Sequence, residues 1–174
     1  MEEVYIPQER LSALKDEPKT RKLIESACSC KLSINDDECV VIDGAPYDVF
    51  VAKSVVYAFG RGFDIAIARL LLNDNYYFTS IDLKHELGSE KRVQRIKARI
   101  IGESGKTKRY IESVSAVKMS VYGDTVSFIG SMEEIKEAET AVNTLIEGGT
   151  HKLAYLRMEA AHRKNKRTAQ TPTF

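Results

Sequence analysis

Two glycines within a run of cations are the residues of this chain best suited to hold a ligand. Gly102 and Gly105 lie in the stretch IIGESGKTKRYIE, between an apolar segment and a basic one. A glycine inside a helix costs roughly 0.5–1 kcal/mol relative to alanine, so this pair predicts a deliberate break between two helices. A loop with no side chains at its two ends lets a nucleic acid backbone approach closely, and the next helix offers unpaired N–H groups to a phosphate.

Cations surround this pair of glycines. Between residues 91 and 109 they are Lys91, Arg92, Arg95, Lys97, Arg99, Lys106, Lys108 and Arg109, against the single acid Glu103. For a single strand, each neutralised phosphate contributes about −0.7 to the slope of log K against log salt, so contact with about four phosphates predicts a slope of about −3. Lys106 and Arg99 flank the loop and are the expected closest contacts. A merely solvated helical face is the alternative, and the neighbouring glycines disfavour it.

The net charge of +1 hides an asymmetry between the two halves of the chain. Residues 1–87 carry 10 Lys and Arg against 15 Asp and Glu, which gives 10 − 15 = −5, whereas residues 88–174 carry 16 against 10, which gives 16 − 10 = +6. This split indicates a polyanionic partner for the second half and a different role for the first. No apolar run is long enough to span a membrane, and the acidic start MEEVYIPQER is unlike a signal peptide, so we expect a cytoplasmic protein.

The sequence repeats itself at an offset of 87 residues, which becomes 86 further along. KDEPKTRKLIESACSCKLSI, from Lys15, aligns with GESGKTKRYIESVSAVKMSV, from Gly102. In this alignment Lys19, Thr20, Ile24, Glu25 and Ser26 fall on Lys106, Thr107, Ile111, Glu112 and Ser113, and after the slip Val40, Gly44 and Ala52 fall on Val126, Gly130 and Ala138. The chain is therefore predicted to contain two copies of one structural unit.

Hydrophobic periodicity gives the elements of each copy. In the second copy YYFTSIDL, from Tyr76, is rich in strand formers, residues 93–101 have helical spacing, and a further helix is predicted over 106–114. The alternating stretches VKMSV and TVSFIG predict a hairpin around residues 122–124, and the apolar residues of 135–145 predict a long amphipathic helix.

The first copy has the same order of elements, which makes the predicted fold α+β. It consists of two tandem β-α-α-β-β-α units, each a three-stranded antiparallel sheet with helices on one face. The predicted organisation is a degenerate unit at 1–62, a connecting helix and turn at 63–75, the RNA-binding unit at 76–150 and a basic C-terminal tail at 151–174. For the tail, RNA contact and a purely solubilising role remain open alternatives.

The element order, with Gly-x-x-Gly between the first two helices, resembles the type I KH domain. More narrowly, the chain resembles the archaeal and eukaryotic "partner of Nob" family of KH proteins in small ribosomal subunit maturation. GRGFDIAIARLLLNDNYYFTSIDL, VSFIGSMEEIKEAETAVNTLIEGG and AYLRMEAAHRKNKR carry this resemblance over nearly the whole chain. It implies binding near the 3′ end of the small-subunit rRNA, help to the endonuclease that trims it, contact with the alpha subunit of initiation factor two, and no nuclease activity of its own.

The resemblance and the cation pattern together predict the RNA-contacting residues. They are Arg95, Arg99, Ile101, Gly102, Glu103, Ser104, Gly105, Lys106, Lys108, Arg109 and Met119. Ile101 is expected near the floor of a groove and Met119 is expected to face the bases. The chain departs from the usual KH pattern at Glu103, because such loops usually have a basic residue between the glycines. A carboxylate there opposes a phosphate by about 1 kcal/mol, which favours a weaker clamp assisted by the tail or by partners.

The first copy lacks the glycines of this loop. Lys15 and Pro18 stand where Gly102 and Gly105 stand in the second copy, and Pro18 also removes a backbone donor. With Asp16 and Glu17 between them, this loop should repel phosphate. The first unit is therefore predicted to bind protein or simply to pack.

Other chemistry finds little support in the sequence. Cys28, Cys30 and Cys39 have no nearby histidine to complete a four-ligand zinc site, so no metal or cofactor is expected. GESGKT is two residues shorter than a nucleotide-binding P-loop and does not follow a strand. The chain is therefore predicted not to be an enzyme. Three rivals stay open: a protein-interaction scaffold whose KH units no longer bind RNA, a general RNA-binding protein unrelated to ribosomes, and, as the weakest of the three, a nucleotide-using enzyme.

Overall fold

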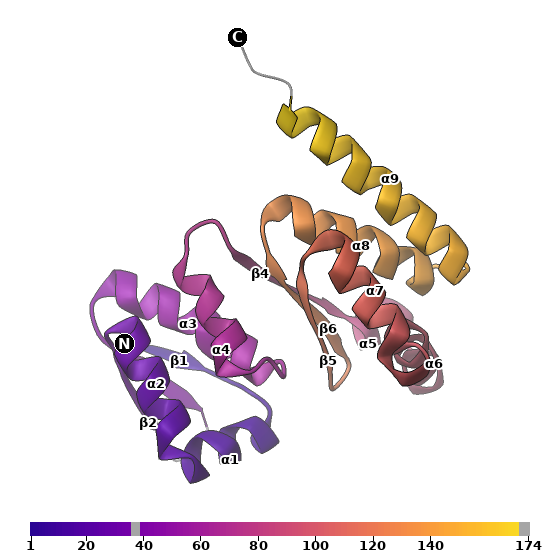
Figure 1. Ribbon diagram of the computed structural model, residues 1–174. Coiled ribbons are helices and arrows are strands. Elements are labelled where there is room, and N and C mark those ends of the chain that lie inside the picture. The colour runs from indigo at the N-terminus through magenta and orange to yellow at the C-terminus, as the bar shows by residue number, and fades with distance from the viewer. Residues whose placement is uncertain (36–38, 171–174) are drawn as a thin grey trace. The chain divides into compact units, whose positions relative to one another are not determined.

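The computed structural model describes residues 1–35 and 39–170, and in it the chain forms two compact units, Met1–Phe78 and Thr79–Phe174 (Figure 1). The first unit contains β1 (Glu2–Val4), α1 (Gln8–Asp16), α2 (Pro18–Cys28), β2 (Lys31–Ile34), β3 (Val40–Asp43), α3 (Pro46–Gly60), α4 (Ile65–Ala68) and the 3-10 turn η1 (Arg69–Leu72). Its strands form an antiparallel sheet in the order β1-β3-β2. Leu11, Leu14, Ile24 and Ile42 are fully buried in this unit.

The second unit repeats this plan, with a short helix inserted after its first strand and a long helix added at its C-terminal end. It contains β4 (Tyr77–Asp82), α5 (Leu83–Leu87), α6 (Glu90–Ile101), the 3-10 turn η2 (Glu103–Gly105), α7 (Lys106–Ser115), β5 (Lys118–Tyr122), β6 (Thr125–Gly130), α8 (Met132–Ile146) and α9 (His151–Gln170). The strand order β4-β6-β5 matches that of the first sheet, position for position. The predicted α+β fold of two KH-like units is confirmed, including the hairpin, in which Tyr122 pairs with Thr125.

Local sequence signals account for the helices around the second sheet. Val93, Ile96 and Ile100 form the buried face of α6, as the periodicity predicts. Helix α8 begins with a capping box, in which the Ser131 hydroxyl accepts from the Glu134 amide and the Glu134 carboxylate accepts from the Ser131 amide. Helix α5 was not predicted.

The repeat extends to individual side-chain contacts. In the first unit the Glu25 carboxylate accepts a hydrogen bond from the backbone N–H of Leu32, at 2.9 Å. In the second unit the carboxylate of Glu112 accepts from the N–H of Met119, also at 2.9 Å. Each contact ties a helix, α2 or α7, to an outer strand of its sheet, so this part of the repeat preserves architecture rather than a ligand site.

The segment predicted as a basic tail forms helix α9 over His151–Gln170, while residues 171–174 lie outside the described part of the chain. Ala154 and Met158 are fully buried and belong to the hydrophobic core of the second unit. The buried carboxylate of Glu137, on α8, lies 2.7 Å from His162 Nδ1 and accepts a hydrogen bond from Asn165 at 2.8 Å. Helix α9 is thus packed against the rest of its unit. The predicted domain boundaries remain predictions.

Within the described residues, 1–35 and 39–170, no helix has both the length and the apolar character needed to cross a membrane.

Candidate nucleic-acid interface

The loop between α6 and α7 has an unusual backbone. Gly102, Ser104 and Gly105 all have positive φ, at 74°, 51° and 76°. Gly102 also has ψ of 171°, a combination that is essentially restricted to glycine. Glu103 and Ser104 are exposed to solvent at the tip. The loop is therefore a single tight turn that presents main chain at the surface.

A close contact explains why Gly102 has no side chain. A Cβ at this position would lie 2.3 Å from Thr107 Oγ1 and 2.7 Å from the Thr107 backbone nitrogen. Thr107 belongs to the first turn of α7 and is only 5% exposed, so it has no room to move away. The glycine therefore allows the end of α6 to meet the start of α7.

The N-terminus of α7 is open toward the loop. Its N-cap is Gly105, which has no side chain to cap the first turn, and of the first amides that of Lys106 donates to the Glu103 carbonyl oxygen. Such amides, together with the helix dipole, favour an anion by roughly 0.3–1 kcal/mol at a surface site. The exposed Lys106 and Arg109 lie in the first turns of the same helix, and the Arg109 guanidinium lies 3.2 Å from the position of a Cβ at Gly105. Backbone donors and cations thus meet at one place, where a phosphate oxygen can accept from them.

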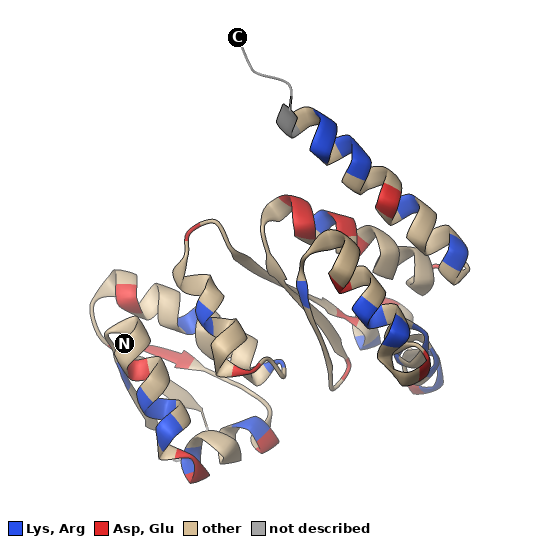
Figure 2. Cartoon of the chain, in the orientation of Figure 1, with Lys and Arg blue, Asp and Glu red and all other residues tan. Residues whose placement is uncertain are grey.

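The predicted cations divide into exposed ones and ones whose side chain is held by a hydrogen-bond partner. Lys and Arg lie along α6, α7 and α9 of the second unit (Figure 2). Arg95 and Lys106 are exposed, whereas the Lys108 ammonium donates to both Glu112 carboxylate oxygens, at 3.1 and 3.2 Å. Glu112 therefore partly neutralises the charge of Lys108, which attracts a phosphate less strongly than the sequence alone suggests.

Arg99 does not project toward the loop as expected. Its guanidinium donates to the carbonyl oxygen of Leu145 at 3.3 Å and to that of Gly149. These carbonyls belong to the end of α8 and the turn after it, where a cation also complements the helix dipole. The sequence could not reveal this, because the partners lie 46 and 50 residues away.

The two predicted apolar contacts behave differently from one another. Ile101 is 36% exposed, next to the loop, where it can touch a base. Met119 was expected to face the bases, but its side chain is 3% exposed and lies in the hydrophobic core. Side chains alternate between the two faces of a strand, and the prediction assigned Met119 to the face opposite to the one it occupies. Only the backbone of Met119, held by Glu112, lies at the outer edge of the sheet.

Helix α9 braces the helices on both sides of the loop, a role that was not recognised in the sequence. The Tyr155 hydroxyl donates to Thr107 Oγ1 at 3.2 Å, and its ring packs on Tyr110 with ring centroids 4.3 Å apart. The Tyr110 hydroxyl in turn bonds Glu159, which raises the pKa of Tyr110 above its ordinary value. On the other side, His151 Nε2 lies 2.9 Å from the Arg99 carbonyl oxygen. The first half of α9 therefore fixes the end of α6 and the start of α7 together.

The equivalent loop of the first unit has none of these features. Lys15, Asp16, Glu17 and Pro18 have no positive φ among them, and Pro18 is the first residue of α2. Thr20, the counterpart of Thr107, donates its hydroxyl proton to the Glu17 carboxylate at 3.0 Å. In the first unit the Glu17 carboxylate therefore lies where the second unit has backbone amides and cations.

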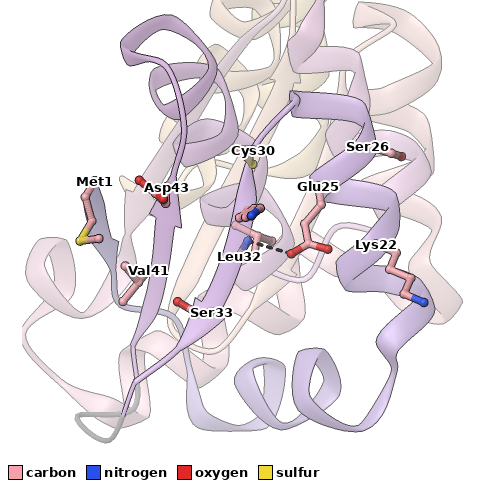
Figure 3. Close-up of a pocket in the computed structure, with 10 residues that line it drawn as sticks. Met1, Lys22, Glu25, Ser26, Cys30, Leu32, Ser33, Val41 and Asp43 are labelled. Atoms are coloured by element: carbon pink, nitrogen blue, oxygen red, sulfur yellow. Dashed lines mark hydrogen bonds between the residues drawn. The ribbon is translucent and has the colours of Figure 1, made fainter.

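The first unit has instead an open cavity of about 780 Å³ beside α2 and its sheet (Figure 3). Charged residues of both signs line it: Lys22 and Glu25 from α2, and Lys31 and Asp43 from the strands. The Glu25 carboxylate points to the Leu32 amide rather than into open space (Figure 3). With this mixed charge, the cavity lacks the cationic surface that single-stranded RNA requires.

The cysteines are buried. Cys28, Cys30 and Cys39 are all free thiols inside the first unit. Burial, with a smaller contribution from Cys30, raises the pKa of the Cys28 thiol to about 11. Among the described residues, no group of three His, Cys, Asp or Glu is arranged to hold a metal ion.

The strand order, the Gly-x-x-Gly turn and its flanking helices define the second unit as a KH domain of type I. The family model described as a eukaryotic type KH domain (KH-domain type I), in its PNO1 second-domain form, matches residues 77–163. A KH domain-containing protein of Methanocaldococcus jannaschii is 36% identical over 173 residues, covering 96% of this chain and 76% of that protein. The pre-rRNA-processing protein PNO1 of Chaetomium thermophilum is 31% identical, covering 94% of this chain and 67% of that protein.

Solved structures show the same relationship. Dim2p from Pyrococcus horikoshii is 34% identical with a TM-score of 0.83, covering 91% of this chain and 98% of that one. The same organism supplies a complex of a/eIF2alpha, aDim2p and rRNA, which matches with 34% identity and a TM-score of 0.84, covering 94% of each chain. The chain belongs to the PNO1 family of KH-domain proteins, the archaeal members of which include Dim2p.

Proposed function

We propose that the protein is an RNA-binding factor of small ribosomal subunit assembly that grips single-stranded RNA with the loop Gly102–Gly105. The observation that carries the proposal is the backbone of this loop: three positive φ angles and an uncapped helix N-terminus, exposed beside free cations. A KH loop of this kind clamps about four nucleotides through their backbone. The sugar-phosphate chain would rest against Gly102 and Gly105, with Lys106 and Arg109 beside it.

Each predicted contact residue takes a definite role in this proposal. Arg95, Lys106 and Arg109 would supply charge to the phosphates, and Lys108 a weaker share because Glu112 holds it. Ile101 would contact a base, while Glu103 and Ser104 would form the exposed tip. Arg99 and Met119 would support the site from behind, as an anchor to α8 and as part of the core. No catalytic step is assigned to the protein.

The relatives suggest which RNA and which partners are involved. One relative is named for pre-rRNA processing, and another is in a complex with a/eIF2alpha and rRNA. We therefore propose the 3′ end of small-subunit rRNA as the RNA, and the endonuclease that trims this end and the alpha subunit of initiation factor two as protein partners, all acting in the cytoplasm. The first unit, with its acid-lined loop, is the part proposed to meet a protein or to pack.

Salt-titrated binding tests the proposal directly. A short single-stranded oligonucleotide from the rRNA 3′ end should bind saturably, and log K should fall with log salt with a slope of about −3. A protein-interaction scaffold would show neither a saturable site nor a slope. A general RNA-binding protein would bind unrelated strands equally well, so crosslinking in cell extract, followed by mapping of the bound RNA, separates it from an rRNA-specific factor.

A further inference from the structure

Besides the glycine loop, the second unit has a hollow lined by cations. It has a volume of about 470 Å³ and is formed between α6 and the end of α8. Three arginines of α6 line it, Arg92, Arg95 and Arg99, together with Ile146, Glu147 and Gly148 from the end of α8. Their spacing of three and four residues places these arginines on one face of the helix.

The hollow has an excess of positive charge and unused donors. Its single acid, Glu147, already has a cationic partner in Arg157, whose guanidinium lies 3.5 Å away. Arg99 covers two carbonyls at the end of α8, which reduces the repulsion that this helix end would exert on an anion. A guanidinium has five N–H donors. Arg92 uses one of them, to the Leu87 carbonyl at 3.3 Å, and no described residue bonds the exposed Arg95.

The position of the hollow suits a strand that already occupies the loop. Arg95 lies seven residues before Gly102 and Arg92 ten residues before it. At 1.5 Å per helical residue, these separations are about 10 and 15 Å along α6. Successive phosphates of a strand are at least about 3.4 Å apart. A strand therefore needs no more than about four nucleotides to cover the distance of about 15 Å from Gly102 to Arg92.

We propose that the hollow lined by Arg92 and Arg95 is a second phosphate subsite, which holds the RNA strand where it leaves the four-nucleotide clamp. This inference rests on the proposed function, since it takes the strand from the glycine loop. Planar guanidinium groups suit phosphate oxygens because they donate two parallel hydrogen bonds. Free inorganic phosphate shares this chemistry, but it would not make affinity depend on the length of an oligonucleotide.

The test compares a tetranucleotide from the rRNA 3′ end with octanucleotides that extend it by four residues on the 5′ or on the 3′ side. We expect one of the two extensions to bind about 3- to 30-fold more tightly than the tetranucleotide, the range expected of two exposed charge contacts. The double variant Arg92→Gln/Arg95→Gln should lose that gain and reduce the magnitude of the octanucleotide salt slope by about 1.4. Its affinity for the tetranucleotide should fall less than its affinity for the octanucleotide, because Arg95 also contributes charge to the clamp whereas Arg92 serves only the subsite.

The matched control is Lys84→Gln/Lys91→Gln, which removes the same charge from exposed positions outside the hollow. It should keep the length-dependent gain. The single variant Arg95→Gln, whose side chain has no bonded partner among the described residues, guards against misfolding and should lose part of the gain.

Equal loss in both double variants would overturn the subsite, as would an octanucleotide that gains nothing on either side while the tetranucleotide binds. If the tetranucleotide itself fails to bind the unaltered protein at low salt, the proposed function fails, and the subsite with it.

Discussion

The loop between α1 and α2 and the loop between α6 and α7 occupy the same place in a shared fold, but they differ in backbone conformation. Residues 102–105 turn through positive φ angles and end at an uncapped helix, whereas residues 15–18 have ordinary angles and end at a proline that begins α2. The sheets around them have the same strand order, and both units tie a helix to a strand through a glutamate. The fold is therefore kept without the site. What distinguishes the proposed RNA clamp from a structural turn is the backbone conformation of four residues.

A second difference between the units is α9. The second unit has a long helix that holds both ends of its loop through Tyr155 and His151. In the first unit the third helix is followed only by the short α4 and η1. A clamp that must keep a strained backbone in one conformation benefits from such support, since strain persists only where the surrounding structure enforces it.

The largest effect is expected where the glycine of the clamp is replaced by alanine. Gly102→Ala puts a Cβ 2.3 Å from Thr107 Oγ1 in a backbone conformation that costs about 1–3 kcal/mol. The loop must change shape, so affinity for the tetranucleotide should fall roughly 30-fold or more. Gly88→Ala is the matched control, because Gly88 also has positive φ, of 64°, but its Cβ would have nothing within 4 Å. If both variants bind RNA like the parent, the loop geometry is not what grips RNA.

The shared glutamates should matter equally in both units. Glu25→Ala and Glu112→Ala each leave a strand N–H without its acceptor, at 2.9 Å in the intact protein, and should lower the free energy of unfolding of their own unit by about 1–3 kcal/mol. Thermal or denaturant unfolding measures this. If only Glu112→Ala lowered the free energy of unfolding, the contact would not be part of the architecture that the two units share.

The acid at the loop tip should weaken binding slightly. Glu103 is exposed beside the proposed phosphate position, and Glu103→Gln removes a repulsion of about 1 kcal/mol. Affinity for the tetranucleotide should therefore rise by about fivefold at low salt, and by less at high salt. An unchanged affinity at low salt would place the phosphates away from this residue.

The smallest effect is expected from removing the hydrogen bond between Tyr155 of α9 and Thr107. Tyr155→Phe removes only the hydroxyl that donates to Thr107, at 3.2 Å, and keeps the ring on Tyr110. It should cost about 0.5–1 kcal/mol of stability and lower RNA affinity by about twofold to threefold. Tyr77→Phe, at an exposed ring, is the control and should change neither. Loss of stability with full RNA affinity would show that α9 supports the fold but not the clamp.

Much of the fold could be predicted from the sequence because the two copies of the repeat give the same element pattern independently. Strands and helices that are ambiguous in one copy become clear once Lys19 to Ser26 is aligned with Lys106 to Ser113. The glycine loop was also predictable, since glycine marks conformations that other residues avoid. Helix α5 also has a signal in the sequence: the Asp82 carboxylate caps the amides of Lys84 and His85, and Gly88 ends the helix.

Other parts of the site depend on contacts that sequence spacing does not encode. Arg99 resembles any cation beside the loop until its carbonyl partners at the end of α8 are placed. The packing of α9 rests on Ala154 and Met158, of which one is too small to give a strong hydrophobic signal. Met119 was assigned to the wrong face because a strand has two faces and the prediction did not fix which one packs inward.

The central claim, that RNA is held by the loop of the second unit and not by that of the first, is tested most directly by one pair of variants. Fluorescence anisotropy with the rRNA 3′-end tetranucleotide would compare Gly105→Asp with Lys15→Asp, one change in each of the two equivalent loops. Gly105→Asp adds a carboxylate at φ of 76° and should lower affinity roughly 30-fold, from about 2 kcal/mol of strain and repulsion. Lys15→Asp changes charge by more and should stay within about twofold of the parent. Unchanged binding by Gly105→Asp together with loss of binding by Lys15→Asp would contradict the account.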